Sequence, residues 1–96
     1  MAPVVLSLRR SQKVDAVLIS TGQHREILHQ ALAGFGLEPD HDLAIMQHGQ
    51  TLAEVTCRAL SGLDGLLGEL DPKMVVAQGD TTTTFVSALN AFYRQI

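Results

Sequence analysis

The sequence predicts an α/β fold in which a doubly wound, Rossmann-like parallel sheet is covered by helices. Two observations support this prediction for the 96-residue chain. Segments with helical periodicity alternate with short apolar runs, which is typical of parallel strands joined by right-handed crossovers. In addition, the run MVVA at 74–77 leads through a Gly-Asp turn into a helix. Open α/β sheets bind their ligands where a strand ends and a helix begins.

The N-terminal segment has two interpretations, and a strand is predicted after it. Residues 2–9 are apolar enough for a strand, but they also suit a helix with Pro3 in its first turn and Arg9 near its end. Residues 14–20, VDAVLIS, are mostly apolar and β-branched, which favours a buried strand. Thr21 and Gly22 are expected to end that strand.

The middle of the chain predicts a helix and a short strand. Apolar residues recur at helical spacing over 24–35, and Gly36 supplies a C-terminal stop. Residues 37–41 contain a proline and are predicted to form a polar turn. Residues 43–46 are a candidate for a short strand.

The C-terminal half predicts two helices on either side of a strand. Thr51 and Glu54 form a capping-box pattern at the start of a helix over 51–70, and Asp71-Pro72 ends it. A strand is predicted over 74–78, and a helix over 82–94. The apolar stripe of the first helix consists of Leu52, Val55, Ala59, Leu63, Leu66, Leu67 and Leu70, and one face of the second consists of Phe85, Ala88, Leu89 and Phe92.

Composition excludes several classes of function. The formal net charge is −3 and the seven Lys and Arg residues are scattered, so no nucleic-acid surface is predicted. No segment is long and apolar enough for a membrane span or a signal peptide. Cys57 is the one cysteine, which suits a reducing cytoplasm, and it is predicted to be buried in its helix. The four histidines lack metal-ligand spacing, and the motifs GxGxxG and GxxxxGK(S/T) are both absent, so neither a metal nor another cofactor is predicted.

The candidate site is the turn that joins the strand at 74–78 to the last helix. Gly79 allows a sharp turn and close approach of a ligand to the backbone. Asp80 and Thr81 are good N-cap residues, so Asp80 has two interpretations: a helix cap or a functional carboxylate. The free N–H groups at the helix start, around Thr82, favour an anion such as a phosphate.

Several stretches of the chain together resemble one enzyme family, the non-hydrolysing UDP-N-acetylglucosamine 2-epimerases. The resemblance covers essentially all 96 residues. The matching stretches are MAP at the start, STGQHREIL at 20–28, DLAIM at 42–46, QTLAEVTCRAL at 50–60, GDTTTT at 79–84 and FVSALNAFY at 85–93.

The resemblance implies that residues 1–96 are a partial N-terminal domain of a two-domain, GT-B-type protein. It implies a helix at 2–9, and it places the family's first strand and its C-terminal domain outside this chain. In the usual strand order the first strand lies at the centre of the sheet, so the strands at 14–20 and 74–78 are expected to lack the neighbour between them.

The resemblance also implies an activity and a set of site residues. The activity is the interconversion of UDP-GlcNAc and UDP-ManNAc by elimination and re-addition of UDP, in the cytoplasm, by a homodimer that supplies cell-surface polysaccharide synthesis. Asp80 is implied as catalytic, and Gly79, Thr81 and Thr82 as substrate-binding. Gln23 and Arg25 match positions beside a second, regulatory UDP-sugar. The alternatives are an inactive truncated remnant or another α/β module that binds sugar nucleotides.

Overall fold

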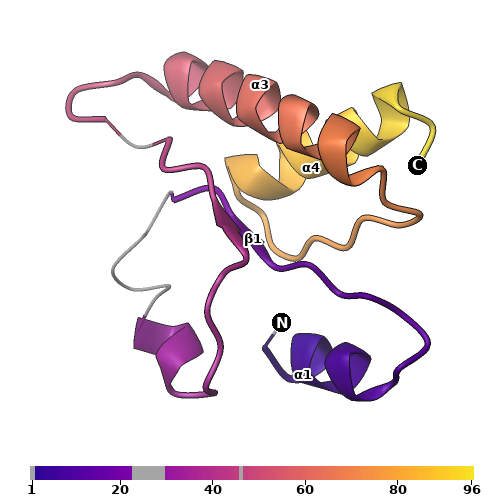
Figure 1. Ribbon diagram of the computed structural model, residues 1–96. Coiled ribbons are helices and arrows are strands. Elements are labelled where there is room, and N and C mark those ends of the chain that lie inside the picture. The colour runs from indigo at the N-terminus through magenta and orange to yellow at the C-terminus, as the bar shows by residue number, and fades with distance from the viewer. Residues whose placement is uncertain (1, 23–29, 46) are drawn as a thin grey trace. The chain divides into compact units, whose positions relative to one another are not determined.

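The structure, a computed structural model, describes residues 2–22, 30–45 and 47–96 (Figure 1). The chain divides into two units, Met1–Ala44 and Ile45–Ile96, each with buried apolar side chains of its own. Helices and a parallel sheet are both present, which confirms the predicted α/β class. The elements of the first unit are α1 (Ala2–Arg10), β1 (Ile19–Ser20) and β2 (His41–Asp42), and those of the second are α3 (Leu52–Leu70) and α4 (Thr82–Tyr93).

Helix α1 decides between the two interpretations of the N-terminal segment. Residues 2–9 are helical, as the resemblance implied. Pro3 lies in the first turn, where a backbone N–H would have no partner within the helix. The arginines of the last turn, Arg9 and Arg10, complement the negative end of the helix dipole. Val5 is buried in a small apolar core with Leu32 and Leu37.

The sheet of the first unit is parallel but shorter than the sequence predicted. Its register pairs Ile19 with His41 and Ser20 with Asp42. The prediction of a strand over 14–20 was therefore wrong for its first five residues. A strand was also predicted at 43–46; residues 43–45 are not a strand, residue 46 lies outside the described part of the chain, and the observed strand is at 41–42, beginning at the last residue of the predicted polar turn. A strand extends only as far as a neighbour pairs with its backbone.

The end of the predicted helix over 24–35 is a Schellman motif. The structure describes its last turn, at 30–33, while residues 23–29 lie outside the described part of the chain. The Leu37 N–H donates to the Leu32 carbonyl at 2.9 Å, and the Gly36 N–H donates to the Ala33 carbonyl at 3.0 Å. Gly36 has a positive φ of 68° and Leu37 packs in the same core as Leu32, so the predicted glycine stop is confirmed.

Helix α3 agrees closely with its prediction. The capping box is present, with the Glu54 N–H donating to Thr51 Oγ1 at 3.2 Å and the Thr51 N–H to Glu54 Oε1 at 3.3 Å. The helix ends at Asp71, which has a left-handed conformation. Two details of the prediction were wrong. Leu52 is exposed because it lies in the first turn beyond the packed stripe, and Cys57 is also exposed.

Helix α4 lies beside α3 and runs in the same direction (Figure 1). Asn90 Nδ2 donates to the Leu60 carbonyl at 3.2 Å, and Arg94 Nε pairs with Asp64 Oδ1 at 2.9 Å. The apolar face identified in the sequence is not the buried one, because Phe85 is 58% exposed and Phe92 75% exposed. The side chains of α4 that are buried are Val86, Ser87 and Asn90. Helix α4 has apolar or small side chains on two of its faces. The face that is buried is the one that packs against α3, its neighbour within unit 2.

The segment between α3 and α4 is not a strand in this structure. Residues 74–78 have no regular secondary structure, Met74 is 76% exposed and Val76 is also exposed. The prediction of a buried strand there was wrong for a simple reason. A strand needs a neighbouring backbone to pair with, and the described part of unit 2 contains no other strand. Because α3 and α4 run in the same direction, the segment between them must return along their length, as the chain does in an α/β crossover.

Candidate functional site

The candidate site of the second unit is the turn that enters α4, residues 79–82. Gly79 has a φ of +117°, a conformation that side-chain-bearing residues rarely adopt, so the predicted glycine turn is confirmed. A Cβ atom at Gly79 would come within 4 Å of only Thr84 Oγ1, at 3.6 Å, among the described atoms. The backbone at this turn is therefore open to close approach by a ligand, with the hydroxyl of Thr84 beside it.

Asp80 is exposed and plays no visible part in holding the fold together. The N-cap of α4 is Thr81, with extended backbone angles of −90° and 168°, so Asp80 is not the cap. Asp80 has no hydrogen bond or ion pair with any residue that the structure describes. The capping interpretation of Asp80 is therefore wrong, and its carboxylate is open to solvent.

The threonines after Asp80 form the first turn of α4. Thr81 makes no side-chain cap hydrogen bond, so its hydroxyl does not occupy the N–H groups of that turn. Thr82 is half-buried and begins the helix. The sequence suggested that Thr81 to Thr84 frame the site, and it assigned substrate binding to Thr81 and Thr82 among them. The structure places the hydroxyl of Thr84 next to Gly79.

The second group of predicted site residues follows β1. Gln23 and Arg25 lie outside the described residues, so their placement is not described. The residues just before them, 20–22, are closely packed. Ser20 and Thr21 are buried, and the Gly22 N–H donates to Ser20 Oγ at 3.1 Å. Gly22 has a φ of +84°, and a Cβ atom there would lie 2.9 Å from the Cα of Ala44.

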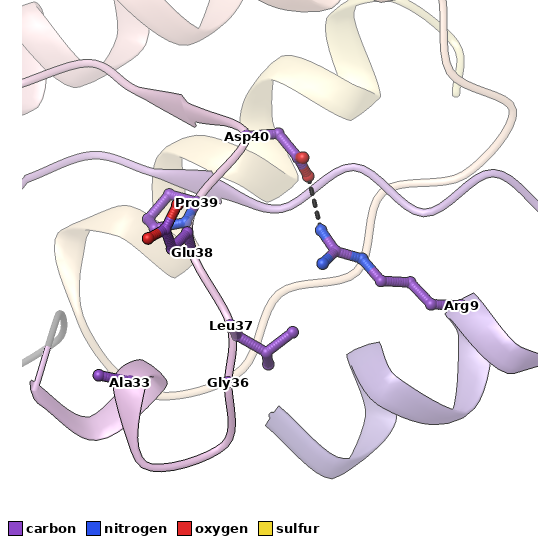
Figure 2. Close-up of a pocket in the computed structure, with 7 residues that line it drawn as sticks. All are labelled: Arg9, Ala33, Gly36, Leu37, Glu38, Pro39 and Asp40. Carbon is purple, nitrogen blue, oxygen red and sulfur yellow. Dashed lines mark hydrogen bonds and ion pairs between the residues drawn. The ribbon is translucent and has the colours of Figure 1, made fainter.

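A separate hollow of about 530 Å³ lies in the first unit, and it contains none of the predicted site residues. Figure 2 shows Arg9 reaching across it to Asp40, with Nη2 of Arg9 2.8 Å from Oδ2 of Asp40. The same Asp40 oxygen accepts the Leu18 N–H at 2.7 Å. This ion pair ties α1 to the start of the sheet, so its role is structural. The lining residues are Arg9, Ala33, Gly36, Leu37, Glu38, Pro39 and Asp40.

Two general features of the structure bear on the class of protein. Among residues 2–22, 30–45 and 47–96, no group of three or more His, Cys, Asp or Glu side chains is arranged to hold a metal ion. None of the helices in the described part of the chain has the length and apolar character needed to cross a membrane.

Parallel strands in one unit, and an open glycine turn before a helix in the other, are features of α/β proteins that bind phosphorylated ligands. Comparison with known families identifies which of them this is. The model of the UDP-N-acetylglucosamine 2-epimerase family matches residues 6–96. The chain therefore belongs to that family, as its motifs predicted.

Individual relatives agree with this assignment. The chain is 49% identical over 96 residues to the UDP-N-acetylglucosamine 2-epimerase of Bacillus subtilis (strain 168) and 49% identical to that of Escherichia coli (strain K12). All of the chain is covered in both matches, but only 25% and 26% of these relatives. The chain thus spans about a quarter of the length of the curated relatives it matches.

Solved structures show the same fold. The crystal structure of the UDP-GlcNAc 2-epimerase from Neisseria meningitidis bound to UDP-GlcNAc matches with a TM-score of 0.94 and 43% identity. It covers 100% of this chain and 26% of its own. The S. aureus MnaA–UDP structure matches with a TM-score of 0.90 and 36% identity, covering 100% of this chain and 25% of its own.

The close approach of Gly22 to Ala44 leads to a testable prediction about stability. We expect Gly22→Ala to lower the unfolding free energy by more than the roughly 1–2 kcal/mol that a left-handed conformation costs a side-chain-bearing residue. The added methyl group would also collide with the backbone of Ala44. The matched control is Gly36→Ala, since Gly36 also has a positive φ but has no described atom within 4 Å of the place that an added methyl group would occupy.

The measurement is the Tm of a full-length chimera, in which this segment replaces the 96 residues that it matches in the Bacillus subtilis relative. Both variants should melt below the unsubstituted chimera, Gly22→Ala furthest. Equal Tm values for the two variants would contradict the close approach of Gly22 to Ala44.

Proposed function

We propose that the chain is part of an enzyme that interconverts UDP-GlcNAc and UDP-ManNAc, with Asp80 as a catalytic acid–base group. The observation that carries this proposal is the exposed carboxylate of Asp80, which the described fold does not use and which follows the open turn at Gly79. Family membership supplies the class of reaction, and the two solved relatives named with UDP-GlcNAc and UDP support a UDP-sugar as the ligand.

The reaction inverts one carbon atom and needs proton transfer. In elimination, the C2–H bond breaks as a base takes the proton, a C1–C2 double bond forms, and UDP leaves with the electron pair of the C1–O bond. Re-addition of UDP to C1, with a proton delivered to the opposite face of C2, forms the epimer. Positioned carboxylates perform such transfers. Asp80 would hold or move a proton at this part of the sugar.

The turn beside Asp80 is suited to the diphosphate. Gly79 leaves room for the backbone to approach a phosphate, and the first turn of α4 presents N–H groups and the positive end of the helix dipole. Thr81 and Thr82 add hydroxyl groups, and Thr84 lies beside Gly79. We assign Gly79, Thr81 and Thr82 to substrate binding on this basis.

The wider setting is part of the same proposal. The relatives are about four times as long as this chain, which supports a GT-B-type protein in which residues 1–96 are part of the N-terminal domain and a C-terminal domain completes the cleft. The complete protein would act in the cytoplasm as a homodimer and supply cell-surface polysaccharide synthesis. Sedimentation of the full-length protein tests its oligomeric state.

The test of the activity uses the full-length chimera with the Bacillus subtilis relative. Incubation with UDP-GlcNAc in D₂O should form UDP-ManNAc, and both sugars should carry deuterium at C2, because the proton lost in elimination is replaced from solvent. A chimera that melts cooperatively and binds UDP, yet forms neither UDP-ManNAc nor C2-deuterated sugar, would show that this segment belongs to a binding module instead.

Arg25 provides a second prediction, because a guanidinium can bind phosphate oxygens bidentately. We expect Arg25→Ala in the chimera to change the affinity for UDP-GlcNAc, or its regulation by a second UDP-sugar, while Tm stays close to that of the parent. The matched control is Arg10→Ala, an exposed arginine at the end of α1, which should change neither. A large drop in Tm with unchanged kinetics would show that Arg25 is structural.

A further inference from the structure

The buried contact between α3 and α4 contains a polar side chain. Asn90 is 1% exposed, and its Nδ2 donates to the backbone carbonyl of Leu60 at 3.2 Å. Val86, one turn earlier on α4, is fully buried. The aromatic side chains of α4, Phe85, Phe92 and Tyr93, are exposed. An amide, rather than an apolar side chain, therefore lies in this buried contact.

A buried amide specifies register where apolar packing does not. Apolar side chains can pack in several alignments along a neighbouring helix, whereas a donor must meet an acceptor or remain buried without a partner. Carbonyl groups recur along α3 at every turn. The Asn90 donor would therefore also find an acceptor if α4 were shifted along α3 by one turn, about 5.4 Å. A second contact is needed to select one alignment.

Arg94 provides that second contact. It follows Asn90 by one turn, as Asp64 follows Leu60, and its Nε lies 2.9 Å from Oδ1 of Asp64. A shift of α4 by one turn, about 5.4 Å, would carry the guanidinium away from its present position, where it lies 2.9 Å from Asp64 and beside Gly68. Gly68 also leaves room for the guanidinium, because a Cβ atom there would lie 3.0 Å from Nη2 of Arg94.

We infer that Asn90 and Arg94 are positioning residues that hold α4 in one register along α3, and that they thereby place Asp80 and its turn. Helix α4 begins two residues after Asp80, so any displacement of α4 along its axis is passed to that carboxylate. This inference rests on the proposed function of Asp80. Reacting groups must be placed closely, and a misplacement of about 1 Å can lower a rate by about 10²-fold.

The first test compares two substitutions at the α3–α4 contact in the full-length chimera. Asn90→Leu keeps the branch point and the number of side-chain heavy atoms but removes the donor, and Val86→Ala removes apolar volume but no hydrogen bond. We expect Asn90→Leu to lower kcat by roughly tenfold or more with Tm at or above that of Val86→Ala, and Val86→Ala to keep kcat within about twofold at a temperature well below its Tm.

A merely structural role for Asn90 would give the opposite pattern. In that case the loss of kcat would follow the loss of Tm across both variants, or Asn90→Leu would keep the parent kcat. Either result would overturn the inference.

The second test exchanges the charges of the exposed ion pair, which leaves the buried contact untouched. Arg94→Asp faces Asp64 with a like charge and should lower kcat roughly fivefold or more, by promoting the slipped register. The double variant Asp64→Arg/Arg94→Asp restores the pairing and should recover most of the parent kcat. Full activity of Arg94→Asp, or no recovery in the double variant, would contradict the role of this pair.

A structural readout separates this inference from the proposed function. Crystal structures of the chimera and of its Asn90→Leu and Arg94→Asp variants measure the place of α4 along α3 whether or not the protein is active. We expect α4 to be displaced along α3 in both variants. An inactive parent with displaced variants would contradict only the proposed function, whereas α4 in the parent register in both variants would overturn the register inference even if the parent is active.

Discussion

Asp80→Asn in the full-length chimera is expected to lower kcat by at least about 10²-fold, within the usual range for loss of a general acid–base group. The amide has nearly the same shape as the carboxylate but cannot exchange a proton at neutral pH. Because Asp80 makes no hydrogen bond or ion pair with the described residues, the substitution should leave Tm unchanged. Kinetics with UDP-GlcNAc and a thermal melt of the same sample measure both effects.

The control for this prediction is a second exposed aspartate. Asp15→Asn removes the same charge from the segment before β1 and should leave kcat unchanged. Deuterium incorporation at C2 adds a sharper readout, because loss of proton transfer should reduce exchange and epimerisation together. Turnover of Asp80→Asn close to that of the parent would remove Asp80 from the mechanism.

The 96-residue chain by itself is expected to self-associate, to show no cooperative unfolding as a monomer, and to form no UDP-ManNAc. Its second unit leaves Met74, Phe85 and Phe92 largely exposed. Burial of a Phe or Met side chain is worth about 1.5–3 kcal/mol, so such a surface favours association. The sheet of the first unit has two short strands among the described residues, and two strands are marginally stable without further packing.

Sedimentation velocity and a denaturant melt of the purified chain test this prediction. The double variant Phe85→Gln/Phe92→Gln is the matched comparison, since it removes the two exposed phenylalanine rings of α4 without touching the buried contact with α3. It should sediment as smaller species than the parent chain. A parent chain that is monomeric and unfolds cooperatively would contradict the structural part, and UDP-ManNAc formed in proportion to the chain would contradict the rest.

Local sequence signals predicted the helices well, since each depends on residues close together in the chain. The capping box of Thr51 and Glu54 and the glycine stop at Gly36 both appear as predicted, because their hydrogen bonds join residues three to five positions apart. The positive φ of Gly79 is local in the same way. The candidate site at 79–82 was therefore found from the sequence, although its chemistry is still a prediction.

The strands and the buried faces depended on contacts that the sequence does not contain. Apolar, β-branched residues at 74–78 favour a strand, but pairing requires a neighbouring backbone, and none is present in the described part of its unit. The same reason shortens β1 to two residues, because β2 pairs only there. In α4, the buried face is set by the side on which α3 packs, so Asn90 and Val86 are buried while Phe92 is exposed.

The sequence by itself thus determined the family, the α/β class, the ends of α3 and the place of Asp80 before α4. Only the tertiary structure decided which face of α4 is buried, and it showed that Asn90 and Arg94 meet Leu60 and Asp64. The physical reason is the range of the interactions. Caps and turns are closed by neighbours in the chain, whereas the alignment of two helices is set by partners thirty residues apart.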